Sequence, residues 1–465
     1  MKNNQILILL IIYAIIAIIT IIYFDGTGDA GDSIHHYQFA RYAPLHPELF
    51  FNHWAKPLYV LLVSPFAQLG FIGVKIFNAI VTLLTVFFTF KIAQKLHLHN
   101  AIIAAILLIA SPLCFVLTFS GLTEPLFALF ISIGLYAILV DKPIISCLFI
   151  SFLPFVRSEG LIIIGAFGLY FLLKKAWRLI PFLLIGHVVY SIAGFFVHHD
   201  LLWVFNRIPY ARLSSTYGDG GDLFHFVDQM NYVVGVPIYI LFWVGVLSIL
   251  WKCVKKKITK EILVLIFICF FSFFIAHSLF WYLGIFNSMG LKRVLVGVSP
   301  LSSIISLMGF NLLTEELLKN KKIPKLIFQG LIIICILIFP FTSNPAAIDW
   351  EKDLSLTKDQ QSAQQIGTFI AQHSESTQRF FYAHPYLSEV LNLDHFDTNK
   401  RLELAPVNMS RIQSGDIVIW ENWFAVVEHG VTMESLDKNT DLIKLHNSNV
   451  WDEDREISYS VYKKK

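Results

Sequence analysis

The chain has 465 residues, of which 56% are hydrophobic and 42 are Phe, whereas only 15% are charged. This composition is far more apolar than that of soluble globular proteins and indicates a polytopic membrane protein. The formal net charge is +3, and we expect membrane lipids but no nucleic acid among its partners.

The first apolar segment, residues 6–23, is long enough to cross the hydrocarbon core of a bilayer as a helix. It exceeds the apolar core of a signal peptide and has no small-x-small cleavage site beside it, so we interpret it as a retained helix. Further apolar segments predict about eleven transmembrane helices in all. They lie at 71–91, 101–118, 123–140, 143–156, 159–173, 179–197, 233–251, 262–283, 292–312 and 326–342. The segments 143–156 and 159–173 are short, which is typical of tilted or incomplete spans.

Basic residues predict the orientation of these helices. With the amino terminus in the cytoplasm, Lys and Arg concentrate on the inner side, notably in the loops at 251–260 and 319–325. Acidic residues show the opposite bias, so we expect any chemistry on the outer face. The compact loops favour a bacterial inner membrane.

The composition changes near residue 342, after which no apolar span follows. We therefore predict a membrane domain over 1–342, with outer loops at 25–70 and 198–232, and a soluble domain over 343–465 on the outer side. Helices at 356–373, 385–391 and near Met433, with strands at 379–382, 416–420, 442–445 and 457–462, predict a small α/β fold. No glycine-rich phosphate loop adjoins the GDIVIWENW segment, so we interpret this domain as structural support or an acceptor-docking module.

Loop one (residues 25–70) places charge directly after a membrane helix. Its candidate residues are Asp29, Asp32, His35, His36, Tyr37, Arg41 and Lys56. A partly buried carboxylate here could act as a general base, and Lys56 or Arg41 could neutralise a phosphate. The alternative is that these polar side chains only face water.

Two polar turns interrupt helices on the same predicted side. The first contains Thr123, Glu124 and Pro125, which could equally be ordinary helix capping. The second contains Arg157 and Glu159, which form either a structural ion pair or the wall of a polar cavity. In the 198–232 loop, Arg207 and Arg212 could bind a phosphate or meet lipid headgroups and solvent. We expect no cofactor, because the histidines show no compact metal-binding spacing and a divalent ion would need ligands from separate loops.

Four segments together resemble the GT-C superfamily of membrane glycosyltransferases: GDAGDSIHHYQFAR, the W-x-K-P-L-Y segment at 54–59, the TEPL turn and the RSEG turn. The sequence is most similar to the protein O-mannosyltransferase and aminoarabinose transferase branch, and TEPL and RSEG also resemble dolichol-dependent mannosyltransferases. The specific motifs cover about residues 24–64, 120–126 and 157–160, and the topology extends the likeness over the membrane region.

This resemblance implies an inverting transfer of a sugar from a polyprenyl-phosphate carrier to an acceptor protein, lipid or glycan on the outer side. It further implies that Asp32 is the general base and that Lys56 contacts the donor phosphate. The family often has Asp-Glu where this chain has Asp32-Ser33, which leaves Asp29 as an alternative base.

Two other classes of function stay open. A transporter or flippase would also have many helices, but such proteins tend to place ionisable groups near the bilayer midplane on broken helices. A non-catalytic membrane scaffold, whose tail binds partners, is the second alternative.

Overall fold

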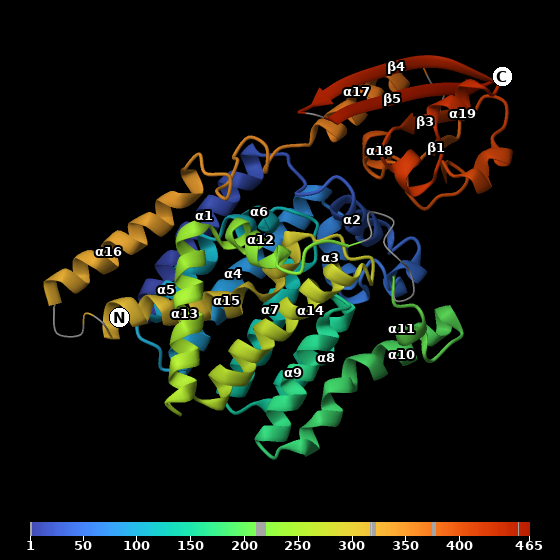
Figure 1. Ribbon diagram of the computed structural model, residues 1–465. Coiled ribbons are helices and arrows are strands. Elements are labelled where there is room, and N and C mark those ends of the chain that lie inside the picture. Colours follow the sequence, from blue (N-terminus) through green and yellow to red (C-terminus); the bar gives the residue numbers. More distant parts are fainter. Residues whose placement is uncertain (1, 211–219, 317, 319–321, 374–377, 454) are drawn as a thin grey trace.

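A computed structural model of the chain describes residues 2–210, 220–316, 318, 322–373, 378–453 and 455–465. It consists of a helical bundle and a five-stranded sheet domain that lies at one end of the bundle, above α2 (Figure 1). We call this the domain end of the bundle.

Each predicted apolar segment is helical, and seven helices of the described chain are long and apolar enough to cross a membrane. The chain is thus an integral membrane protein. The long helical segments are α1 (Lys2–Tyr23), α4 (Phe71–Lys95), η3 (Trp177–Leu184) with α10 (Ile185–His198), α13 (Val236–Val254), η4 (Glu261–Ile268) with α14 (Cys269–Leu283), η5 (Lys292–Val298) with α15 (Ser299–Asn311) and η6 (Leu312–Glu316), and α16 (Lys322–Ile338) with η7 (Phe339–Phe341).

An eighth candidate span is broken rather than straight, which corrects the prediction of one helix over 101–118. It consists of α5 (Ala101–Ile109) and α6 (Pro112–Thr118), which meet at an angle of 66°. Pro112 begins α6, and the residue before a proline is disfavoured in helical conformation. The break therefore follows from the sequence at Ser111.

The predicted helices between 123 and 173 are present but shorter than a straight span. They are α7 (Glu124–Leu139), α8 (Pro143–Ser151) with η2 (Leu153–Phe155), and α9 (Gly160–Leu173). Five further helical elements of the connecting loops were not predicted: α2 (Asp32–Tyr42), η1 (Pro47–Phe51), α3 (Pro57–Ala67), α11 (Trp203–Asn206) and α12 (His225–Val234).

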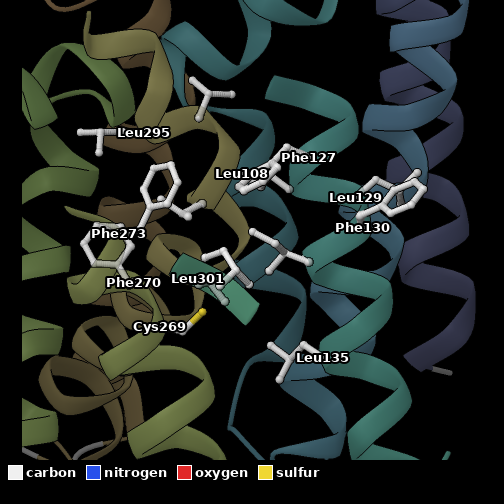
Figure 2. Packing of buried hydrophobic residues seen from close by; sticks show 14 of the residues in the cluster. Leu108, Phe127, Leu129, Phe130, Leu135, Cys269, Phe270, Phe273, Leu295 and Leu301 are labelled. Carbon is white, nitrogen blue, oxygen red and sulfur yellow. The ribbon is translucent and has the colours of Figure 1, made fainter. Parts of the chain in front are cut away.

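The span of η5, α15 and η6 is buried from Val294 to Asn311 and forms the centre of the bundle. Figure 2 shows part of its surroundings, where side chains of α7 and α14 pack beside Leu295 and Leu301. Small residues allow close approach to α13, since a Cβ on Gly245 would lie 1.9 Å from the Ile305 carbonyl oxygen. This central helix begins with Lys292 and Arg293 at the domain end.

The C-terminal domain has a mixed sheet in the order β2-β1-β3-β5-β4. Strand β1 is parallel to β2 and β3, whereas β5 is antiparallel to β3 and β4. The strands are β1 (Phe380–Tyr382), β2 (Arg401–Glu403), β3 (Ile417–Glu421), β4 (Leu442–Asp452) and β5 (Arg455–Lys464), and the helical elements are α17 (Lys358–His373), α18 (Tyr386–Val390), η8 (Pro406–Arg411), η9 (Phe424–Glu428) and α19 (Met433–Asp437). The predicted α/β class is confirmed, although β2 was missed and β4 and β5 extend beyond the predicted strands.

The sheet domain rests directly on loop one. Ile34 of α2 belongs to the apolar cluster of the domain, and Gln38 donates a hydrogen bond to the Pro385 carbonyl oxygen over 2.6 Å. At the end of α1, the Gly26 amide donates to the Leu354 carbonyl oxygen over 2.7 Å. The domain therefore covers the loop that carries the candidate acids.

Candidate functional site

A tight turn between α1 and α2 sets the positions of the two loop-one acids. The Gly31 amide donates to Asp29 Oδ1 over 2.7 Å, and the Ser33 hydroxyl donates to the Thr27 carbonyl oxygen over 2.6 Å. Asp32 begins α2, where a carboxylate interacts favourably with the free amides of the first turn. The turn therefore holds Asp29 and Asp32 in fixed places three residues apart.

The turn before α7 packs against this loop. Gly121 donates its amide to Ser33 Oγ over 2.6 Å and accepts a hydrogen bond from the Tyr59 hydroxyl over 2.8 Å. A Cβ on Gly121 would lie 2.3 Å from the Ser33 carbonyl oxygen, so only glycine allows this approach. The TEPL turn, which carries Glu124 at the start of α7, is thus a neighbour of loop one.

Arg293, at the start of the central helix, contacts three carboxylates. Its Nη1 lies 2.7 Å from Asp29 Oδ2, its Nη2 donates to Asp32 Oδ2, and its Nε is 3.7 Å from Glu124 Oε1. The Glu124 side chain is completely buried. A guanidinium presents several donors in one plane, which suits a group that joins several carboxylates.

Arg157 extends this arrangement toward α9 and α14. Its Nη1 is 2.6 Å from Glu124 Oε1, and its Nη2 is 2.9 Å from Glu159 Oε1, which in turn lies 3.8 Å from His277 Nε2. We call Asp29, Asp32, Glu124, Arg157, Glu159 and Arg293 the charge network. The RSEG turn therefore forms the ion pair that was one of its two alternatives, and Arg157 also joins the loop-one acids through Glu124 and Arg293.

Lys56 reaches the Arg157 end of the charge network from the start of α3. Its Nζ donates to Ser158 Oγ over 2.9 Å, and its backbone has a φ of 66°, a strained conformation for a non-glycine residue. Burial lowers the pKa of the Lys56 ammonium to about 8, against the opposing effect of Glu159.

The two acids differ in how their oxygens are used. Both oxygens of Asp29 accept hydrogen bonds, from the Gly31 amide and from Arg293. Asp32 gives one oxygen to Arg293, and within the described part of the chain its other oxygen has no donor. Burial raises the pKa of Asp29, whereas at Asp32 the cations outweigh burial, with Arg293 foremost, and the pKa is lowered. Asp32 therefore combines an ionised carboxylate with a free oxygen.

The overall fold recurs in solved structures over nearly the whole chain. ArnT from Cupriavidus metallidurans bound to undecaprenyl phosphate matches with a TM-score of 0.62 at 12% identity, over 99% of this chain and 98% of that chain. The apo state of the same protein matches with a TM-score of 0.64, at the same identity and coverage. The chain has the GT-C fold.

An oligosaccharyltransferase with the GT-C fold is also similar. The protein from Archaeoglobus fulgidus, tethered to an acceptor peptide, matches with a TM-score of 0.53 at 13% identity, over 86% of this chain and 64% of that chain. No family model and no curated protein matches the sequence, so the resemblance inferred from its motifs is supported by structure alone.

Within this GT-C fold, the other loop-one candidates take different positions. Tyr37 and Arg41 both bond Glu389 of the sheet domain, with Arg41 Nη1 3.0 Å from Glu389 Oε2. The His36 ring stacks on Trp54 with the centroids 5.1 Å apart, and His35 lies edge-on to the same ring at 5.6 Å. Burial lowers the pKa of His36 to about 3 and of His35 to about 4, which keeps both rings neutral at pH 7.

Arg207, the described candidate of the 198–232 loop, is not part of the charge network. Arg207 is exposed at the end of α11, and Arg212 lies outside the described residues. Among the described residues, no group of three or more His, Cys, Asp or Glu side chains is arranged to hold a metal ion.

Arg293 is the member of the charge network that was not predicted as a site residue. Its signal in the sequence is a Lys-Arg pair at the start of a span, which is also typical of residues that only set the orientation of a helix. Its contacts with Asp29, Asp32 and Glu124 come from segments more than 150 residues away in the sequence. Sequence spacing cannot reveal such a pairing.

Proposed function

We propose that the chain is a membrane glycosyltransferase that moves a sugar from a polyprenyl-phosphate carrier to an acceptor hydroxyl, with inversion at the anomeric carbon. The observation that carries this proposal is the charge network, in which the acids of loop one meet the TEPL and RSEG turns. The GT-C fold supports it, because the same fold in ArnT binds undecaprenyl phosphate. In our proposal the sheet domain lies outside the cytoplasm, in a bacterial inner membrane.

In the proposed reaction, the oxygen of the acceptor hydroxyl attacks the anomeric carbon of the donor sugar. The bond from that carbon to the carrier phosphate breaks, and polyprenyl phosphate leaves with the bonding electrons. Asp32 takes the proton of the hydroxyl, because it is ionised and has a free oxygen. Asp29 and Arg293 hold Asp32 in place, and Asp29 is the alternative base.

Lys56 would stabilise the charge that develops on the leaving phosphate. Its ammonium donates a hydrogen bond to Ser158 Oγ, at the other end of the charge network from Asp29. Glu124, Arg157 and Glu159 then act as the buried support that links the two ends.

The proposal is tested by mass spectrometry of surface glycans and glycoproteins from a deletion strain. We expect a single sugar residue to be missing and to return with the wild-type gene. Asp32→Asn should reduce transfer by about 10²–10⁴-fold, the usual contribution of a general base, with normal expression and unchanged binding of undecaprenyl phosphate. Asp29→Asn should reduce it less.

Two results would contradict different parts of the proposal. If Asp32→Asn fully restored sugar transfer in the deletion strain, Asp32 would be excluded as the base. If only Asp29→Asn abolished transfer, Asp29 would be the base instead. An unchanged glycan profile in the deletion strain, together with failure of the purified chain to bind undecaprenyl phosphate, would favour the transporter or scaffold alternatives.

A further inference from the structure

A cavity of about 820 Å³ opens from the Asp29 end of the charge network. Its lining includes Asp29 and Arg293, residues of α6, and much of the segment 342–357 that connects α16 to the sheet domain. This volume lies within the usual range of small-molecule sites. The connecting segment is therefore part of a cavity wall as well as a tether.

The two sides of the cavity differ in chemistry. The α6 side is apolar and includes Pro112, Leu113, Val116 and Leu117. The side formed by 342–357 is rich in hydroxyl, amide and carboxylate groups, for example Ser343, Asn344 and Thr357. Such a wall offers many hydrogen-bond donors and acceptors to a ligand that carries hydroxyl groups.

The charges on the lining nearly balance. Its cations are Lys292, Arg293 and Lys352, and its anions are Asp29, Asp349, Glu351 and Asp353. Arg293 already pairs with the acids, Lys352 Nζ lies 2.6 Å from Glu453 Oε1, and Lys292 Nζ lies over the Tyr232 ring, 5.0 Å from its centroid. A binding site for a phosphorylated or carboxylated headgroup would present an excess of available cations. The lining therefore favours an uncharged ligand.

The cavity and Lys56 lie at opposite ends of the charge network. Of the described residues, neither Lys56 nor its partner Ser158 lines the cavity, whereas Asp29 and Arg293 do. An inverting displacement requires the attacking oxygen and the leaving phosphate on opposite faces of the anomeric carbon. If the carrier phosphate is at Lys56, the attacking hydroxyl must approach from the side of the cavity.

We infer that this cavity binds the acceptor and that the acceptor is an uncharged, hydroxyl-rich glycan. The inference rests on the proposed function, because it assigns the second substrate of the same reaction. It also gives the segment 342–357 a role in acceptor specificity. The shared chemistry is the neutral sugar unit, whether a lipid or a protein carries it.

The inference can be tested with the purified full chain in lipid nanodiscs on a glycan array that contains neutral, phosphorylated and carboxylated oligosaccharides. Two variants fill the cavity from the 342–357 side, Ala347→Trp and Ser343→Trp. The matched control is Ala371→Trp, at an exposed position of α17 that does not line the cavity. Binding of undecaprenyl phosphate is measured in parallel for every variant, by thermal shift.

We expect the wild type and Ala371→Trp to bind neutral glycans, and both cavity variants to lose about tenfold or more in affinity while still binding undecaprenyl phosphate. Binding confined to phosphorylated or carboxylated glycans would overturn the inference. So would binding of neutral glycans that neither cavity variant weakens. A chain that binds undecaprenyl phosphate but no glycan would overturn it as well. Failure of the wild-type chain to bind undecaprenyl phosphate would instead count against the proposed function. Neutral glycans that also bear lipid, placed on the same array, separate the lipid-linked source from the protein-linked one.

Discussion

Glu124 has no solvent-accessible surface, yet it lies between two guanidinium groups. Its Oε1 is 2.6 Å from Arg157 Nη1 and 3.7 Å from Arg293 Nε. Burying a carboxylate is costly unless cations compensate it, and here two cations do so. The carboxylate of Glu124 also compensates the buried charges of Arg157 and Arg293, so its removal should destabilise both arginines.

Glu124→Gln should lower the free energy of unfolding by about 3–5 kcal/mol, since it leaves two buried guanidiniums with less negative charge around them. Thermal unfolding of the detergent-purified chain would measure this effect. Glu48→Gln provides the control, because the side chain of Glu48 is 59% exposed. This substitution should change the free energy of unfolding very little in the same assay. Equal stability of the two variants would show that Glu124 does not hold the network together.

The pKa of Lys56 predicts how carrier binding depends on pH. Burial lowers this pKa to about 8, so the ammonium is fully present below that pH and is lost as the pH rises through it. A phosphate monoester has its second pKa near 6 and stays dianionic over this range. Affinity for undecaprenyl phosphate should therefore be constant up to pH 7.5 and fall by about tenfold per pH unit above pH 8.

Titration calorimetry or a fluorescence assay between pH 7 and pH 9.5 would measure this dependence. Lys56→Arg is the informative comparison, because a guanidinium keeps its proton throughout this pH range. The arginine variant should therefore bind undecaprenyl phosphate equally well at pH 7 and at pH 9.5. The same decline in the arginine variant would mean that another group causes it.

At the scale of elements, the site depends on how closely the turn before α7 approaches loop one. Gly121→Ala would place a methyl group 2.3 Å from the Ser33 carbonyl oxygen, so the two segments must separate. We expect a loss of about 1–3 kcal/mol in stability, typical of overpacking, and reduced sugar transfer because Glu124 moves relative to Arg293. Thermal unfolding and restoration of glycans in the deletion strain would measure the two effects.

Gly165→Ala is a matched control for that substitution. A Cβ at Gly165, inside α9, would have no atom within 4 Å, and alanine is the better helix former. The control should keep or slightly raise stability. If both variants behaved alike, close packing at Gly121 would not be what positions the turn.

Sequence alone predicted the long helices of the bundle, because membrane helices are recognised by apolar length, but it missed the shorter helices of the connecting loops. It also placed Asp29, Asp32, Glu124 and Arg157 at the same end, since loops at alternate helix ends share one face of a membrane. It did not identify Arg293, whose role depends on contacts between distant segments. It missed β2 as well, because a strand of three residues is too short to show an alternating pattern.

At the scale of the whole molecule, the sheet domain and the helical bundle meet across loop one. Arg41 of α2 pairs with Glu389 of α18 at 3.0 Å, and the Tyr42 hydroxyl donates to the Leu393 carbonyl oxygen over 2.9 Å. His46 Nε2 lies 2.9 Å from Asp394 Oδ2 in the same interface. The contacts of Arg41 and Tyr42 involve the helix that begins with Asp32, so docking of the domain and the position of the proposed base are linked.

Glu389→Arg should weaken this docking, because it places two like charges together beside α2. The connecting segment 342–357 should then be cut faster by protease, and sugar transfer should fall although the charge network is untouched. The second substitution Arg41→Glu restores an opposite pair and should recover both properties, which separates a charge effect from general damage. Glu434→Lys, on the exposed surface of α19 at its pair with Lys438, should leave both unchanged. If the double variant stayed as sensitive as Glu389→Arg, the domain would be held by its apolar contacts through Ile34 rather than by this ion pair.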